Sequence, residues 1–129
     1  MMLMPAAALI VVILGAIAVD RAIIFGAQRE LIAVAQAAAN DAASLGVDID
    51  ALRSDGEIVP DLDAIDEAVQ LASLSAEPGT TVAWSLQGDV IEIRMERDVD
   101  LLFTAGVPGA SDIETITATA TAELRVSDP

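Results

Sequence analysis

The side chains that could do chemistry in this sequence are almost all carboxylates. Its 129 residues include 21 Asp and Glu and six basic residues, but no His, Cys or Tyr. The usual general bases, nucleophiles and transition-metal ligands are therefore nearly all missing. The serines lie outside any Gly-x-Ser-x-Gly motif and have no His to activate them. We therefore expect a non-enzymatic protein with no catalytic residues and no small-molecule substrate.

One group of acidic residues, Asp48, Asp50 and Asp55, invites a calcium interpretation. An EF-hand loop needs Asp-x-Asp-x-Asp-Gly with a Glu six residues after the Gly, and this spacing is absent. We interpret residues 47–60 as a solvated loop with a turn at Ser54-Asp55-Gly56-Glu57 and short extended flanks. No cofactor or metal is expected. A membrane-tethered head that binds Ca²⁺ or another cation remains an alternative.

The net charge of −15 argues against binding to nucleic acid or to anionic lipid headgroups. A surface this negative repels nucleic acid, and the sequence has no basic run to offset the repulsion. We therefore expect no nucleic-acid partner, and we interpret the acidity as a means of solubility.

Every charged residue lies after Val19, so the chain opens with an uncharged apolar run. As a helix, Leu3 to Val19 would reach about 25 Å, and a bilayer core about 30 Å thick takes roughly 17–25 residues. This predicts a transmembrane segment over residues 1–20. The alternative is a secreted soluble acidic protein, because Ala16-Ile17-Ala18 is a small-x-small site at which a signal peptide could be cleaved before Val19. No basic residue precedes the run, so charge bias gives no orientation.

The helical pattern continues beyond the apolar run. From Ile24 to Leu45, small or apolar residues recur at steps of three and four, with polar residues between them. No Pro interrupts Ala6 to Leu45, so we expect one helix over about 5–45, ended by Gly46 in a left-handed cap. The transmembrane segment (1–20) would thus continue into an amphipathic extension of the same helix (21–46).

Residues 47–129 are expected to form a small exported head. Asp61 or Asp63 can cap a short helix. The alternation after Thr80 predicts a hairpin that turns at Gly88-Asp89 and places Ile91, Ile93 and Met95 on one face of its return strand. An irregular stretch is expected after Asp98. A last strand is expected over 116–126, with its threonines facing solvent. The predicted fold class is α+β, in which the long N-terminal helix packs on a small three-stranded antiparallel sheet with a second short helix.

The first third of the chain resembles the N-terminal segment of TadE/TadG-like proteins of Flp (tight-adherence) pilus assembly. The matching residues are Gly15, Asp20, Arg29, Leu31 and Ala37 to Ala39, in an apolar anchor that ends Gly-x-x-x-x-Asp and runs into Arg-x-Leu and an alanine-rich helix. The resemblance implies a bacterial, pilin-like protein of the cell surface, similar to a minor pilin or pseudopilin. It also implies a single-pass protein of the cytoplasmic (inner) membrane with its C-terminal head outside the cytoplasm. Many pilin-like proteins carry a Gly cleavage site and a Glu five residues into the mature helix, and nothing here fits that pattern.

The resemblance implies that the partners are other pilin-like subunits or pilus-assembly membrane proteins. Small residues such as Gly15 would permit close approach of neighbouring helices. We expect Asp20 or Arg29 to pair with a neighbouring subunit. The candidate residues for helix–helix assembly are Gly15, Asp20, Arg21, Arg29 and Leu31.

Overall fold

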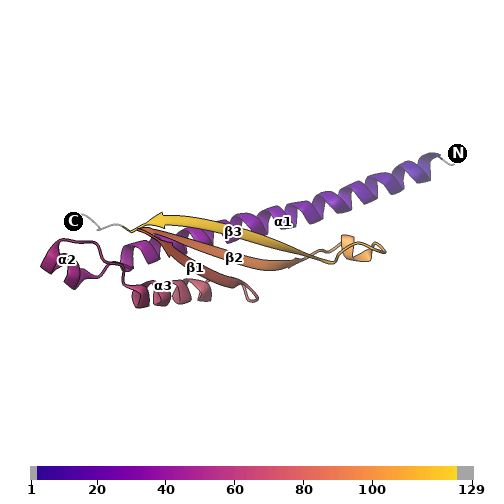
Figure 1. Ribbon diagram of the computed structural model, residues 1–129. Helices are drawn as coiled ribbons and strands as arrows, with labels where there is room; N and C mark the ends of the chain where they lie inside the picture. The colour runs from indigo at the N-terminus through magenta and orange to yellow at the C-terminus, as the bar shows by residue number, and fades with distance from the viewer. Residues whose placement is uncertain (1–2, 125–129) are drawn as a thin grey trace.

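The structure is a computed structural model, and it describes residues 3–124. Along the chain lie helices α1 (Leu3–Leu45), α2 (Ile49–Asp55) and α3 (Leu62–Leu74), followed by strands β1 (Thr81–Gln87) and β2 (Val90–Asp100), the 3₁₀ turn η1 (Thr104–Gly106) and strand β3 (Ile113–Glu123). Figure 1 shows an elongated molecule in which the N-terminal end of α1 projects beyond the rest. The predicted α+β class, with a long N-terminal helix and a three-stranded antiparallel sheet, is confirmed.

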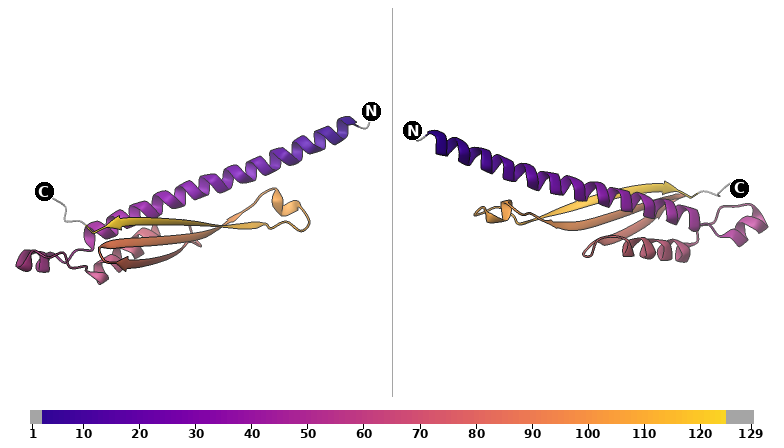
Figure 2. Two further views of the ribbon diagram at one scale, coloured as in Figure 1. Left: turned by 45° about the horizontal axis from the view of Figure 1, so that its top comes forward. Right: turned by 180° about the vertical axis from the view of Figure 1, so that it is seen from behind.

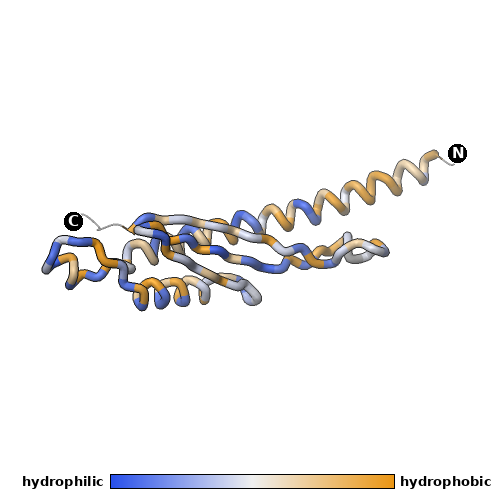
Figure 3. Tube along the Cα trace, in the orientation of Figure 1, coloured by the Kyte–Doolittle hydropathy of each residue, from blue (hydrophilic) through white to orange (hydrophobic). Residues whose placement is uncertain are grey.

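Helix α1 is a single helix of 43 residues, about 64 Å long. It is long and apolar enough to cross a membrane, and the rest of the molecule covers almost none of its most apolar stretch. Figure 3 shows the change along it, from orange and pale turns without blue at the N-terminal end to turns that include blue where the sheet begins. The buried residues of its C-terminal part lie on one stripe and are Leu31, Ala35, Ala38, Ala39, Ala42 and Ala43.

The sheet has the order β1-β2-β3 with antiparallel pairing throughout. Trp84 pairs with Ile93, which in turn pairs with Ala120 on the third strand. One face is apolar and packs on α1 and α3, while alternate residues point to solvent. As expected, Ile91, Ile93 and Met95 are fully buried. Each contributes about 1.5–3 kcal/mol by leaving water, so this row carries much of the core's stability.

Helix α3 lies beside α1 against the same apolar face (Figure 2). Asp61 is its N-cap, and the carboxylate accepts a hydrogen bond from Ala64 N at 3.1 Å. Ile65, Ala68 and Val69 are buried, while Asp66 accepts a hydrogen bond from Trp84 Nε1 at 3.1 Å. The predicted second helix is therefore confirmed with Asp61 as its cap.

The expectation of a plain loop over residues 47–60 is wrong, because this segment contains α2. Its N-cap is Asp48, whose Oδ1 accepts hydrogen bonds from Asp50 N at 2.9 Å and Ala51 N at 3.1 Å. Gly56 ends the helix in the left-handed conformation, with φ of 69°. The expected extended flanks remain as one bridge between Val47 and Pro60. With seven residues and none buried, α2 has no apolar period that a sequence pattern could reveal.

The strand boundaries also differ from expectation. Strand β2 extends to Asp100, which pairs with Ile113, and so includes Val99 and Asp100, the first two residues of the stretch expected to be irregular. Strand β3 therefore begins three residues before the predicted start at Ile116 and ends at Glu123. The predicted end at Val126 lies outside the described residues. Val99 is buried, and this burial explains why the ladder extends so far.

Gly46 ends α1, but not in the left-handed cap that we expected, since its φ is not positive. Its N–H instead donates to Ala42 O at 2.8 Å. A Cβ at this position would lie 2.6 Å from Ala42 O and 2.9 Å from Ile65 Cδ1. Glycine is therefore needed because α3 approaches the end of α1 closely.

We predict that Gly46→Ala destabilises the detergent-solubilised full chain by about 1–3 kcal/mol, the usual effect of overpacking a core. The matched control is Gly26→Ala in the same helix, where nothing lies within 4 Å of the added Cβ. That substitution should be neutral or stabilise by up to about 1 kcal/mol through helix propensity. Thermal unfolding followed by circular dichroism measures both, and equal melting temperatures for the two variants would contradict the packing argument.

Candidate functional site

Asp20 joins helix α1 to the connection between β2 and β3. Among the described residues it is the one charged side chain that is buried, with 3% of its surface exposed. It lies on α1, where the uncharged run of the helix ends. Opposite it is the connection between β2 and β3, which contains η1 and returns to the helix at this point.

Both oxygens of the Asp20 carboxylate accept hydrogen bonds from that connection. Oδ1 accepts from Leu102 N at 3.1 Å and from Phe103 N at 3.2 Å. Oδ2 accepts from Thr104 N at 2.7 Å, more weakly from Phe103 N at 3.3 Å, and also from the Thr104 hydroxyl. Three consecutive backbone N–H groups and one side chain thus converge on a single carboxylate, which we call the Asp20 clasp.

The Asp20 clasp is a helix-capping interaction made across the fold. The first N–H groups of a helical turn have no partner within the turn, and a carboxylate is their strongest ordinary acceptor. For η1 that carboxylate comes from a residue more than 80 positions away in the chain. Because a buried carboxylate without partners would be costly, the loop and Asp20 stabilise each other. The clasp therefore fixes the far end of the β2–β3 hairpin to α1.

The two arginines predicted as assembly residues lie on the surface. Arg21 faces Glu114 at 3.9 Å, with 72% of its side chain exposed, so this ion pair contributes little to stability. Arg29 stacks over the ring of Phe25, with 5.8 Å from its guanidinium carbon to the ring centroid. Such a cation–π contact at an exposed site is worth about 0.5–1 kcal/mol. Phe25 is itself 64% exposed, so the pair forms an accessible patch on α1.

The other predicted residues are placed differently. Gly15 lies on the exposed apolar part of α1, where nothing would meet a Cβ. Leu31 lies in the core of the head and is 2% exposed. The structure therefore does not gather the five residues into one site. Gly15, Arg21 and Arg29 are exposed on α1, whereas Asp20 and Leu31 are used within the chain.

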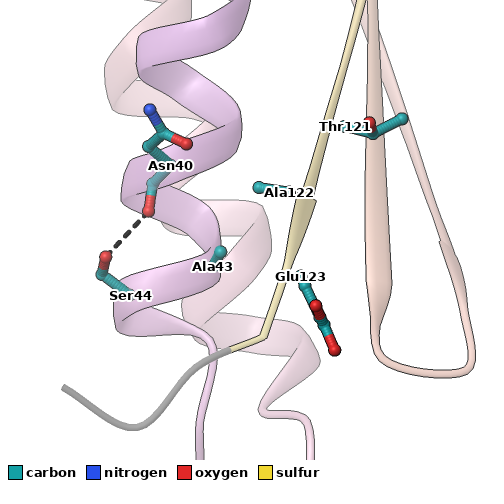
Figure 4. A pocket seen from close by; sticks show the side chains of 6 residues that line it. All are labelled: Asn40, Ala43, Ser44, Thr121, Ala122 and Glu123. Carbon is teal, nitrogen blue, oxygen red and sulfur yellow. Dashed lines mark hydrogen bonds between the residues drawn. The ribbon is translucent and has the colours of Figure 1, made fainter. Parts of the chain in front are cut away.

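The larger hollows on the described part of the surface hold no group of side chains that indicates a reaction or a ligand. One of about 380 Å³ lies between the C-terminal end of α1 and β3 (Figure 4). Its polar side chains include Asn40, Ser44, Thr121 and Glu123, and the Ser44 hydroxyl donates to Asn40 O at 2.8 Å. Within residues 3–124, no three His, Cys, Asp or Glu side chains are grouped so that they could hold a metal ion. The carboxylate of Asp48 caps α2, which explains its position without a cation.

Sequence reasoning singled out Asp20 but missed Thr104 and its neighbours. The available signal was the charge-free stretch between Asp100 and Asp112, in a chain that is otherwise rich in acids. Nothing local in the sequence connects that stretch to Asp20. No protein-family model, curated protein or solved structure matches the chain.

We predict that Asp20→Asn releases the loop from α1. The amide offers one acceptor oxygen, and its NH₂ group would face backbone donors. Hydrogen–deuterium exchange at Leu102 to Thr104 should therefore speed up by roughly tenfold or more, because hydrogen bonds to charged groups are among the stronger ones. The control Arg21→Gln removes only an exposed ion pair and should leave these rates unchanged. Unaltered exchange in Asp20→Asn would show that the clasp does not hold the loop.

Proposed function

We propose that this protein is a membrane-anchored, pilin-like structural component of Flp/Tad pilus assembly. Its helix would cross the cytoplasmic membrane with residues 1–20 and carry the head outside the cytoplasm. The observation that carries the proposal is the form of α1, which is one unbroken helix with a bare apolar first half and a second half that forms the core of the head.

The bare half of α1 needs a partner other than water. Its large side chains are exposed over several turns, with Leu3, Val11 and Leu14 at 85%, 68% and 61%. Soluble proteins seldom expose a continuous apolar surface of this extent, whereas a bilayer or a bundle of like helices would cover it. In a pilus-assembly complex, these two environments would be the membrane and the neighbouring subunits.

Two further features support an assembly role. The resemblance to TadE/TadG-like proteins covers the apolar anchor and the alanine-rich stretch that follows. Past the anchor, Phe25, Arg29 and Ile32 remain exposed on α1, on a surface that the head leaves uncovered. An aromatic side chain, an arginine and an aliphatic side chain together form the kind of patch on which a subunit contact can centre.

The first test is the intact mass of the protein isolated from membranes of its native cells. We expect a membrane-bound species that retains residues 1–19, at 13.3 kDa for residues 1–129 alone. A soluble species that begins at Val19 would mean that the apolar run is a cleaved signal peptide. That outcome would replace the proposal with a secreted soluble protein.

The assembly role is tested by reversing a charge on the exposed surface of α1. Arg29→Glu should reduce recovery of the tagged protein with the pilus-assembly complex by roughly five- to tenfold, as expected for a loss of about 1–1.4 kcal/mol. The matched control is Arg53→Glu on α2, which reverses an exposed charge far from this surface. Asp20 is unsuitable for the test because its carboxylate is engaged within the chain. Equal recovery of both variants would argue against a contact through Arg29.

A further inference from the structure

The connection between β2 and β3, residues 101–112, runs beside the bare half of α1. An apolar hollow of about 380 Å³ separates the two, with Val12, Ile13 and Ile17 on the helix and Phe103 and Val107 on the connection. Figure 2 shows the loop reaching along α1 toward its N-terminus. Along the helix axis, Val12 lies about 12 Å from Asp20. The loop tip is therefore level with helix residues that belong to the apolar run.

The composition of this loop differs from that of the rest of the head. No charged residue occurs between Asp100 and Asp112, although the chain carries a net charge of −15. Its apolar side chains point outward, with Leu102, Phe103 and Val107 exposed by 68%, 50% and 53%. The loop thus presents apolar surface next to an apolar helix, and the head covers neither.

The backbone of the loop is also suited to an environment with little water. A chain segment that enters a bilayer must satisfy its own N–H groups, since lipid offers few acceptors. The Asp20 clasp accepts the N–H groups of three residues, and carbonyl oxygens within the connection accept those of four more. The residues of this connection with bonded N–H groups are Leu101, Leu102, Phe103, Thr104, Gly106, Val107 and Ala110.

The position of the bilayer follows from the charges on α1. The first charged side chain is Asp20 and the second is Arg21, so the hydrocarbon boundary that fits the sequence lies near Val19. Moving the boundary toward the N-terminus, so as to keep the loop in water, would leave Ile13, Leu14 and Ile17 in water as well. The same boundary that covers these helix residues therefore also covers the tip of the loop.

We propose that the β2–β3 loop inserts its apolar tip, Leu102 to Val107, into the head-side leaflet of the bilayer, with lipid chains filling the hollow beside α1. This rests on the membrane anchor of the proposed function, but not on pilus assembly. The exposed Asp100 and Asp112 at the base of the loop limit how deeply it enters. The Asp20 clasp then serves as the link that holds a second membrane contact against the anchor. Because the chain is acidic, the contact is made with lipid chains rather than with anionic headgroups.

The test uses the full chain in phosphatidylcholine vesicles, with tryptophan as a depth probe. The native Trp84 is first replaced by Phe, so that each variant carries a single tryptophan. Phe103→Trp probes the loop, and Val107→Trp is a second probe in case the first variant does not fold. Ile10→Trp reports on the anchor, while Ile49→Trp, 59% exposed on α2, is the matched control at the far end of the head.

In vesicles of dibrominated phosphatidylcholine, tryptophan near the bromine atoms loses its fluorescence. We expect Phe103→Trp and Ile10→Trp to show blue-shifted emission that is strongly quenched, and Ile49→Trp to show neither effect. Quenching at position 10 but not at 103 or 107 would overturn the loop proposal while leaving the anchor intact. Absence of quenching at all positions would overturn the anchor as well. Blue-shifted but unquenched emission at 103 would mean that a second copy of the chain covers the loop, and would also overturn the proposal.

Discussion

A single helix with two differently patterned halves runs through this protein, and the rest of the structure is arranged around it. Up to Val19, α1 is apolar on all sides, whereas beyond Asp20 its buried residues lie on one stripe of mostly alanines. Alanine loses no side-chain entropy on burial and lets the helix approach the sheet closely. The larger Ile91 and Ile93 fill the space from the other side. Without this helix, only α3 would remain on the apolar face of the sheet, so α1 and the head form one folding unit.

The change between the two halves of α1 coincides with a buried carboxylate, Asp20. A lone charge next to an apolar segment would be unfavourable, and the loop removes this difficulty by directing three N–H groups at Asp20. In return, a connection whose described apolar side chains are not buried is held at a defined position along the helix. Such a contact fixes the head relative to the apolar half of α1 more firmly than exposed pairs such as Arg21 with Glu114.

The parts of the fold that repeat over many residues could be predicted from the sequence. The long pattern, first apolar and then amphipathic, predicted α1. The strict alternation of the second strand predicted that Ile91, Ile93 and Met95 share one face, and this face is buried. Helix α2 was missed because it is short and buries nothing, and the role of Gly46 depends on Ile65 from another helix. The partners of Asp20 lie more than 80 residues away, so no local pattern reveals them. The candidate assembly residues came from the sequence, and their contacts with other subunits stay a prediction.

The central claim is that the first half of α1 lies in the bilayer and that its second half carries the head outside the cytoplasm. The chain has no native Cys, so a single introduced cysteine reports its own position. We would label Leu14→Cys and Asn40→Cys with a membrane-impermeant maleimide in right-side-out membrane vesicles from the native cells. The account predicts that position 40 is labelled at once and that position 14 is protected until detergent is added. Labelling of position 14 in intact vesicles, or protection of position 40, would contradict it.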